Sequence, residues 1–330
     1  MSMEENLRDA FGRTIKYLRV SITDKCNLRC KFCVPPQGMK NFSQSEILSF
    51  EEIESIVRVM AKMGVKKIRL TGGEPLVRPG VQDLLRALSG VPGVEELCLT
   101  TNGILFSGMA ASLKEAGLSR VNVSLNSLDE EKFASITGSR GLAQVLKSVE
   151  AALALGFKTK VNCVPCDWNK DELCDIALLA KDKPLDIRFI ELMPIGSAFG
   201  MKGLSSDFVK ARLEARFGKA DSLATDEGGR ASLLAFEGFK GRVGFISPMT
   251  HSFCAECDRL RLASDGKIKL CLCSDEFLDA RKILRSGQSL DKIEEALREE
   301  IILAVKRKPK SHSLGRLSDG VFGSMTQIGG

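Results

Sequence analysis

The chain has 330 residues, of which 44% are hydrophobic and 27% are charged, and it carries a formal net charge of +6 with 11 cysteines and only two histidines. A chain of this length buries enough apolar surface to fold without disulfides, and it corresponds to roughly two domains. The odd number and close grouping of the cysteines argue against a secreted disulfide framework and favour reduced thiols or metal ligands. The net charge favours anionic partners such as nucleotides or phosphates.

The sequence shows no targeting or membrane-spanning pattern. Residues 1–12 contain acidic side chains and no apolar core, which argues against a signal peptide and against a transit sequence. No apolar run approaches membrane-spanning length. The basic cluster at residues 306–310 lacks an aromatic stacking platform, so we interpret it as a solvated segment. We therefore expect a cytoplasmic protein that binds neither a membrane nor nucleic acid.

Strand and helix patterns alternate from residue 17 to about residue 215. Apolar and β-branched runs predict strands at 17–23, 67–72, 96–101, 120–126, 158–163 and 186–192. The stretches between them predict helices; within 142–155, for example, apolar residues recur on one helical face. Six β-α repeats in series imply a parallel sheet with right-handed crossovers, either doubly wound or curved into a partial barrel.

The predicted strands each carry one polar face. In the first strand, Leu18 and Val20 alternate with Arg19. Because side chains alternate along a strand, the apolar set would pack on helices while the polar set lines a shared interior. A flat sheet with one solvated face remains the alternative, but six crossovers on one side would leave that face uncovered, so we favour an open barrel with a cationic cavity. The polar-face residues of interest are Arg19, Arg69, Thr100, Lys160 and, on a comparable strand, Arg188.

The pattern changes after residue 217. Shorter strand-like runs at 231–237, 242–247, 260–263 and 267–272 are followed by predicted helices at about 276–285 and 290–306. We therefore expect an α/β protein with two domains. Residues 1–217 would form a partial (β/α)6 barrel, and residues 218–330 a smaller α+β domain that caps its open side.

The first cysteine group directly follows the first predicted strand. Cys26, Cys30 and Cys33 have the spacing C-x3-C-x2-C. Three thiolates on one short loop can hold three irons of a cubane cluster. The fourth iron would then stay open for a ligand, as a catalytic metal keeps one position free.

The second cysteine group lies in the C-terminal part of the chain. Cys254 and Cys257 form C-x2-C, and Cys271 and Cys273 form C-x-C. Taken alone, this spacing is also compatible with a zinc ribbon of four thiolates.

Several of these segments resemble known families. The first cysteine group, Phe32 before its last cysteine and the sequence GGEP at 72–75 resemble the radical S-adenosylmethionine (SAM) superfamily. The sequence CDRLRLASDG from residue 257 and the final Gly329-Gly330 resemble the GTP 3′,8-cyclase family of molybdenum cofactor biosynthesis. The resemblance extends from about residue 13 to residue 330. It implies a barrel of the radical SAM type and a lyase that converts GTP to 3′,8-cyclo-7,8-dihydro-GTP with SAM and two [4Fe–4S] clusters.

The resemblance also implies roles for individual positions. The implied ligands of the SAM cluster are Cys26, Cys30 and Cys33, and those of the auxiliary cluster are Cys254, Cys257 and Cys271. The implied SAM contacts are the main chain of Phe32 with Gly73, Ser124 and Met193. The expected GTP contacts are Arg19, Arg69, Thr100, Lys160, Arg188, Arg259 and Arg261. The residues expected to act in catalysis are Arg259, Arg261, Gly329 and Gly330.

Two other functions are compatible with parts of the sequence. Another radical SAM enzyme with an auxiliary cluster, such as a peptide-modifying enzyme, would not need the Arg259 and Arg261 pair or the terminal glycines. A zinc-stabilised nucleic-acid-binding protein would use the second cysteine group. Cys273 has no counterpart in the cyclase pattern, so it could complete a zinc site or block the open iron. The expected partners are GTP and a one-electron donor, with a homodimer as a possible assembly.

Overall fold

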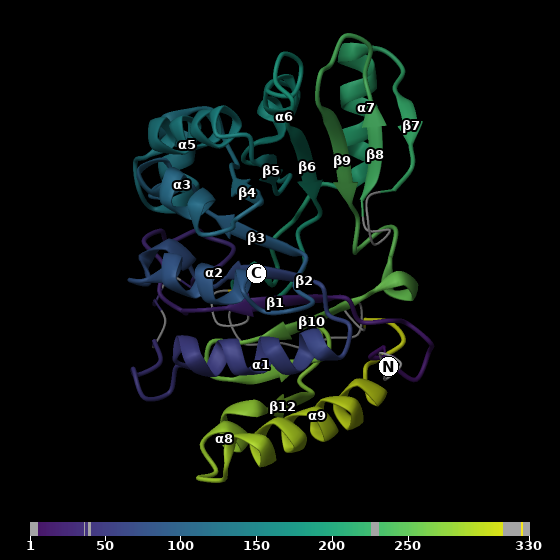
Figure 1. Ribbon diagram of the computed structural model, residues 1–330. Coiled ribbons are helices and arrows are strands. Elements are labelled where there is room, and N and C mark those ends of the chain that lie inside the picture. Colours follow the sequence, from purple (N-terminus) through teal and green to yellow (C-terminus); the bar gives the residue numbers. More distant parts are fainter. Residues whose placement is uncertain (1–5, 36, 39–40, 226–230, 313–324, 326–330) are drawn as a thin grey trace.

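Figure 1 shows the computed structural model, which describes residues 6–35, 37–38, 41–225, 231–312 and 325. The strands of this part of the chain are β1 (Tyr17–Ser21), β2 (Lys67–Thr71), β3 (Glu96–Thr101), β4 (Arg120–Ser124), β5 (Lys158–Cys163), β6 (Asp186–Ile190), β7 (Asp221–Leu223), β8 (Ser232–Ala235), β9 (Arg242–Ile246), β10 (Arg259–Leu262), β11 (Lys267–Lys269) and β12 (Phe277–Asp279). The helices are α1 (Phe50–Lys62), α2 (Val81–Ser89), α3 (Phe106–Glu115), α4 (Glu130–Thr137), α5 (Leu142–Ala154), α6 (Leu173–Leu178), α7 (Ser206–Phe217), α8 (Ala280–Leu284) and α9 (Leu290–Lys306).

Within the described residues the strands form one sheet in the order β12-β11-β10-β1-β2-β3-β4-β5-β6-β9-β8-β7. Strands β1 to β6 follow one another in sequence and pair in parallel. The helices between them lie on the outside of the curved sheet (Figure 1). This arrangement confirms the α/β fold with a partial (β/α)6 barrel.

The strands after residue 217 extend the barrel sheet at both of its edges. β9 pairs in parallel with β6 at one edge, and β10 pairs in parallel with β1 at the other. Residues 247–258, which connect β9 to β10, must therefore cross the open side of the barrel. This crossing segment carries Cys254 and Cys257.

One predicted element differs from the structure. The helix expected at 276–285 begins only at Ala280, because Phe277–Asp279 form β12 and pair antiparallel with β11. Asp279 then starts α8, since its carboxylate accepts a hydrogen bond of 3.1 Å from Lys282 N. The strand β7 has no counterpart among the predicted elements.

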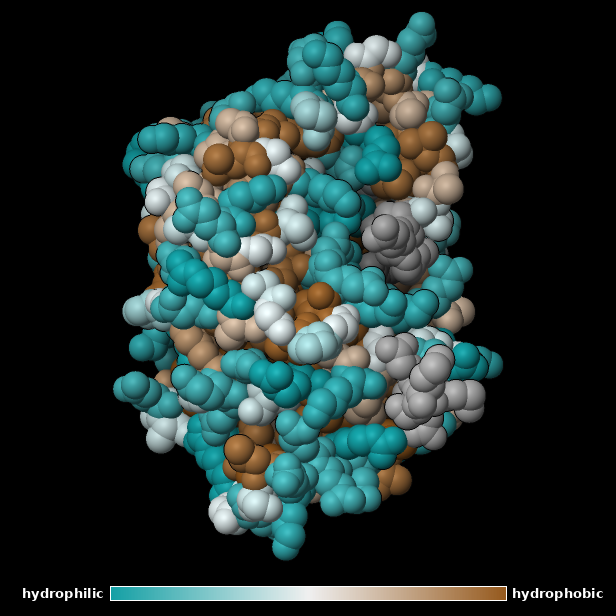
Figure 2. All heavy atoms as spheres, in the orientation of Figure 1, coloured by the Kyte–Doolittle hydropathy of each residue, from teal (hydrophilic) through white to brown (hydrophobic). Residues whose placement is uncertain are grey.

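The apolar face of the barrel strands forms the core. Leu18, Val20, Ile68 and Leu70 are fully buried and belong to one cluster with apolar residues of the surrounding helices. The face drawn in Figure 2 is mostly hydrophilic, with hydrophobic residues in small groups, which is ordinary for a folded chain. In the described part of the chain no helix combines the length and apolarity needed to span a membrane.

Local sequence signals fix the start of α1 and its contact with the C-terminal helices. Ser49 Oγ accepts a hydrogen bond from Glu52 N, and the Glu52 carboxylate accepts one from Ser49 N, which together form a capping box. Arg285, at the end of α8, donates to both oxygens of Glu52 at 2.6 and 2.9 Å. The C-terminal helices are thereby fastened to the barrel helix α1.

Candidate functional site

A cavity of about 380 Å³ lies at the carboxyl ends of the parallel strands and beneath the crossing segment. Sites in parallel α/β folds form at this end of the strands, because the loops there converge. The expected ligand, SAM and GTP positions that line this cavity are Cys26, Cys30, Cys33, Cys254, Cys257, Cys271, Phe32, Gly73, Ser124, Met193, Arg19, Thr100, Arg188, Arg259 and Arg261.

The first cysteine group lies on the loop after β1. Main-chain hydrogen bonds from Arg29 N and Lys31 N to carbonyls at the end of α4, at 2.7 and 3.0 Å, hold this loop. Burial raises the pKa of Cys30 to about 12, and burial together with the neighbouring thiols raises the pKa of Cys33 well above its usual value. Three adjacent half-buried thiols with raised pKa values become thiolates when a cationic centre binds them, so this donor set fits an iron–sulfur cluster.

The GGEP turn after β2 is hydrogen-bonded to the loop that follows β1. Gly73 N donates to Thr23 O at 2.7 Å, and Glu74 N donates to Lys25 O at 2.8 Å. A Cβ atom on Gly73 would lie 2.2 Å from Lys25 O, so only glycine permits this approach.

Glu74 is a buried part of this turn that sequence reasoning did not single out. Its carboxylate accepts hydrogen bonds from Thr101 Oγ1, Asn102 N and Leu76 N at 2.8, 2.7 and 3.1 Å. Burial raises the pKa of Glu74 to about 7. The side chain of Glu74 therefore connects the turn after β2 to the end of β3 through hydrogen bonds. At the same end of β3, Asn102 Nδ2 lies 3.8 Å from Cys26 Sγ.

The second cysteine group has more cationic surroundings. Burial would raise the pKa of Cys257, but Lys308 and Arg259 lower it overall. The pKa of Cys271 is lowered chiefly by a hydrogen bond from Cys273 and further by Lys308, and the pKa of Cys273 is raised by the same contact. These thiolates are stabilised by the protein itself, as ligands of a metal centre require.

The described side chains give no support to a zinc site in the second group. Among the residues that the structure describes, no three His, Cys, Asp or Glu side chains converge closely enough to hold one metal ion. A zinc site needs four ligands around a single ion, whereas the thiolates of a cubane cluster bind different irons and lie farther apart.

Three arginines lie side by side across the seam between β10, β1 and β2. Arg19 is in register with Arg261 on one side and with Arg69 on the other. Burial, together with the neighbouring guanidinium groups, lowers the pKa of Arg19 to about 10 and that of Arg261 to about 9. Such a concentration of buried positive charge is typical of a site for a strongly anionic ligand.

Two of the expected GTP contacts, Arg69 and Lys160, lie deeper in the barrel. Arg69 donates to Tyr17 Oη at 2.5 Å and to Leu99 O at 2.9 Å, and the Nζ atom of Lys160 lies 3.6 Å from Asp186 Oδ2. Neither side chain belongs to the cavity lining. The structure thus brings four of the expected arginines to the cavity and places these two residues behind it.

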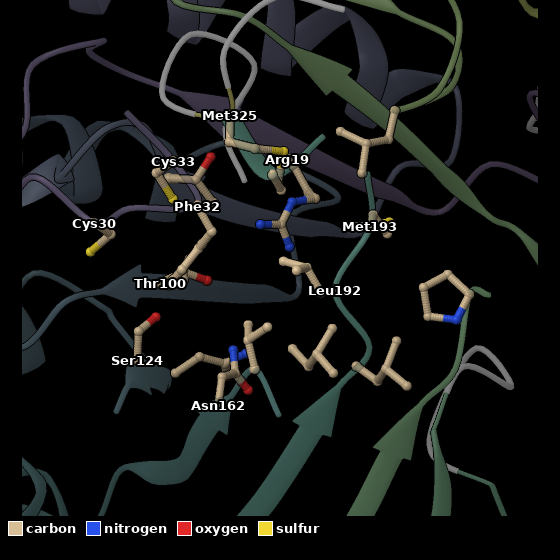
Figure 3. A pocket seen from close by; sticks show the side chains of 18 of the residues that line it. Arg19, Cys30, Phe32, Cys33, Thr100, Ser124, Asn162, Leu192, Met193 and Met325 are labelled. Atoms are coloured by element: carbon tan, nitrogen blue, oxygen red, sulfur yellow. The ribbon is translucent and has the colours of Figure 1, made fainter. Parts of the chain in front are cut away.

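The expected SAM positions surround the cavity from different elements. Figure 3 shows Phe32 and Cys33 on one side, Met193 opposite, Ser124 below and Arg19 projecting toward the centre. The ring of Phe32 stacks on Trp168 with a centroid distance of 6.4 Å. Met325, from the C-terminal tail, also lines the cavity, while Gly329 and Gly330 lie outside the described residues.

Two further asparagines line the cavity; strand alternation placed them on the polar faces, but they were not named as site residues. Asn122 and Asn162 are adjacent in register to expected site residues of the polar strand faces. Each has a buried Oδ1 atom with no hydrogen-bond partner among the described residues. Such orphaned acceptors indicate a ligand that donates hydrogen bonds. The same strand alternation that picked out Lys160 could have identified both.

Comparisons with known proteins agree with this site. Residues 20–180 match the family model described as Radical SAM superfamily, and residues 185–314 match the one described as Molybdenum Cofactor Synthesis C. A GTP 3′,8-cyclase of Alkaliphilus metalliredigens is 42% identical and covers 98% of this chain and 100% of its own length. A GTP 3′,8-cyclase of Moorella thermoacetica is 44% identical and covers 93% of this chain and 95% of its own length.

Solved structures resemble the chain in fold. Streptococcus suis SuiB bound to S-adenosylmethionine superposes with a TM-score of 0.60 at 16% identity, covering 92% of this chain and 77% of that chain. Because its sequence identity is low, SuiB supports the barrel architecture and not a peptide substrate. The curated relatives, by contrast, are similar over almost the whole length. The chain belongs to the GTP 3′,8-cyclase family of the radical SAM superfamily.

Proposed function

We propose that this chain is a lyase that converts GTP to 3′,8-cyclo-7,8-dihydro-GTP, an early step of molybdenum cofactor biosynthesis. The observation that carries the proposal is the single cavity lined by both cysteine groups and by four buried or half-buried arginines. Neither rival function accounts for this combination. A zinc protein would not need the first cysteine group, and a peptide-modifying enzyme would not need a cluster of arginines suited to a triphosphate.

The cofactor sites divide between the two parts of the chain. Cys26, Cys30 and Cys33 would hold the cluster that binds SAM, with Gly73 and the main chain of Phe32 beside it. The further SAM contacts would be Ser124 and Met193. When bound, this cluster and SAM supply the one-electron cleavage that removes a hydrogen atom from the substrate.

The auxiliary cluster is the finer part of the proposal. Cys254, Cys257 and Cys271 would hold a second [4Fe–4S] cluster on the opposite wall. The cationic surroundings of Cys257 and Cys271 support it, because they favour thiolates. The open position of this cluster would face the cavity and bind the base of GTP.

The arginines would bind the substrate through its phosphates. Planar guanidinium groups donate paired hydrogen bonds to phosphate oxygens, and an anionic ligand relieves the mutual repulsion of Arg19 and Arg261. Arg188 and Thr100 line the same cavity, and Arg69 and Lys160 would act from behind it.

Catalysis would combine shielding with precise placement. Arg259, Arg261, Gly329 and Gly330 are the proposed catalytic residues, and the position of Met325 in the cavity lining supports a role for the C-terminal tail. The crossing segment covers the open side of the barrel and would exclude water from reactive species. In this division of labour, residues 1–217 would bind SAM and residues 218–330 would bind the auxiliary cluster.

The remaining partners follow from the chemistry. The reaction needs a one-electron donor to start each cleavage of SAM, and the three half-buried first-group cysteines support access for such a donor. A homodimer is one possible assembly of the chain.

The test is an anaerobic incubation of the iron-loaded protein with SAM, GTP and a reductant. We expect 5′-deoxyadenosine and a cyclised nucleotide in equal amounts, and neither product with Cys33→Ala. ATP in place of GTP serves as the matched substrate control. Cleavage of SAM with GTP left intact would keep the superfamily assignment and refute the proposed substrate.

A further inference from the structure

A buried lysine lies behind the second cysteine group. Lys308 follows α9, and its side chain is only 2% exposed. Its Nζ atom donates hydrogen bonds to Arg259 O at 2.9 Å and to Leu270 O at 2.5 Å. Arg259 is two residues after Cys257, and Leu270 directly precedes Cys271. One ammonium group therefore joins the two segments that carry these cysteines.

The third cysteine of the group is tied to the same stretch of chain. Arg13 donates from Nη1 to Cys254 O at 2.7 Å and from Nη2 to Pro309 O at 2.7 Å. Its Nε atom is paired with Asp9 at 2.5 Å, which fixes the guanidinium group. Residues 308–309 thus connect to all three cysteine-bearing segments.

Among the residues that the structure describes, Lys308 has no carboxylate partner, and both acceptors of its hydrogen bonds are neutral carbonyls. A buried cation is costly unless negative charge lies nearby. An ammonium group also has three donors, and the side chain of Lys308 lines the cavity. Thiolates and sulfides of a bound cluster would supply the missing negative charge, since the cavity that Lys308 lines is also lined by Cys254, Cys257 and Cys271.

We propose that Lys308 is a positioning residue of the auxiliary centre, whose buried ammonium holds the segments of Cys257 and Cys271 together and raises the reduction potential of the cluster bound there. The inference rests on the proposed auxiliary cluster. Reduction adds negative charge to the cluster, so a fixed cation beside it favours the reduced form.

The test is a redox titration of the full chain with both clusters loaded, followed by electron paramagnetic resonance. The signals are assigned with a full-length variant in which Cys26, Cys30 and Cys33 are alanine. Lys308→Gln keeps a donor without charge, Lys308→Met keeps neither, and Lys308→Arg keeps the charge. Lys310→Met is the matched control, because Lys310 is exposed on the same stretch of chain.

In the two neutral variants we expect the ratio of reduced to oxidised auxiliary cluster to fall at least about tenfold at a fixed potential, equivalent to about 59 mV for a one-electron couple. Lys308→Arg and Lys310→Met should leave the ratio unchanged, and the first cluster should not respond in any variant. Loss of auxiliary iron in both neutral variants but not in Lys308→Arg would also support the role of the charge.

Three results would overturn the inference: an unchanged ratio in the neutral variants, an equal shift in Lys308→Arg, or equal loss of auxiliary iron in all three variants at position 308. A wild-type chain whose only signal disappears with the first cysteine group would instead refute the auxiliary cluster itself. Failure of the inference and failure of the proposed function are thereby distinguishable.

Discussion

Cys271 and Cys273 are two residues apart and line the same cavity, with Cys273 buried and Cys271 half-buried. Cys273 packs with Ile195 in a small apolar cluster that includes Met193 and Met325. The contact between the two thiols lowers the pKa of Cys271 and raises that of Cys273. We therefore propose iron ligation by Cys271, as the resemblance implies, and a supporting contact by Cys273.

This assignment predicts different losses of iron. Cys271→Ala should retain about four of the eight irons of two cubane clusters and should lose cyclisation while keeping some SAM cleavage. Cys273→Ala should retain about eight. Iron and sulfide analysis per chain checks both values. A fall to about four irons in Cys273→Ala would make that residue a ligand.

Glu74 predicts a pH dependence of stability. Burial raises its pKa from 4.5 to about 7, so between these values the folded chain holds a proton that the unfolded chain releases. Stability contributed at this site is therefore highest below pH 4.5 and falls as the pH rises to 7, by about 3 kcal/mol in total.

The measurement is the melting temperature of the wild type and of Glu74→Gln across this pH range. Glutamine does not titrate, so the melting temperature of the wild type minus that of Glu74→Gln should decrease from pH 4.5 to 7 and then stay constant. A difference that does not vary with pH would contradict the raised pKa. Asp83→Asn, at an exposed helical site, is the control.

Sequence spacing and alternation could predict which residues share the site, but not their depth or their distant partners. The resemblance implied six cysteine ligands in two groups, and all six cysteines line the cavity. Alternation placed Arg69 and Lys160 on the correct face of their strands, but how far each side chain lies from the strand ends depends on barrel tilt. The role of Lys308 depends on carbonyls 49 and 38 residues away, which no local pattern reveals.

At the scale of elements, the GGEP turn is the most constrained connection. Gly73→Ala should push the turn away from the first cysteine loop, because the new Cβ atom would lie 2.2 Å from Lys25 O. Gly108→Ala, where nothing lies within 4 Å of the new Cβ, is the matched control in α3.

We expect Gly73→Ala to lose SAM binding and part of the iron of the first cluster while the second cluster stays loaded. Gly108→Ala should keep both and gain about 0.5–1 kcal/mol of stability, because alanine is the better helix former. Iron analysis and SAM binding by calorimetry report the result. An unchanged SAM affinity in Gly73→Ala would show that SAM binding does not depend on the close approach of the GGEP turn to the first cysteine loop.

The elements themselves followed largely from periodicity. The six barrel strands appear where apolar and β-branched runs predicted them, because their alternation is set by burial on one face. Helical periodicity was misleading at 276–279, where Phe277–Asp279 complete a sheet edge through pairing with β11. Edge pairing is a tertiary interaction and leaves a weak local signal.

At the scale of the whole molecule, the C-terminal part completes the barrel rather than resting on it. Its strands join both edges of the barrel sheet, so the crossing segment must pass over the cavity mouth. The sequence predicted a cap, but sheet continuity depends on pairings between residues more than 200 positions apart, such as Arg19 with Arg261. At this seam, arginines from the two parts of the chain lie side by side.

Substitutions of Arg19 or Arg261 at this seam should have opposite effects on GTP binding and on the stability of the GTP-free protein. Burial is the main cause of the lowered pKa of both Arg19 and Arg261, and neighbouring guanidinium groups lower each pKa further, including that of Arg19 acting on Arg261. Replacing either with methionine removes a buried charge and should raise the melting temperature of the GTP-free protein by a few degrees. The same change removes a charge-assisted contact to phosphate and should weaken GTP binding about tenfold or more.

Both quantities can be measured on one preparation, by calorimetric titration with GTP and by thermal melting with and without GTP. Arg86→Met, on an exposed part of α2, should change neither. Because Arg19 and Arg261 would contact one ligand, their effects on GTP affinity should be non-additive in the double variant. If a methionine variant melts at a lower temperature than the wild type without GTP and binds GTP with unchanged affinity, the role of the seam is structural. An anion site would behave differently, because its bound ligand stabilises the protein and its like charges destabilise the ligand-free protein.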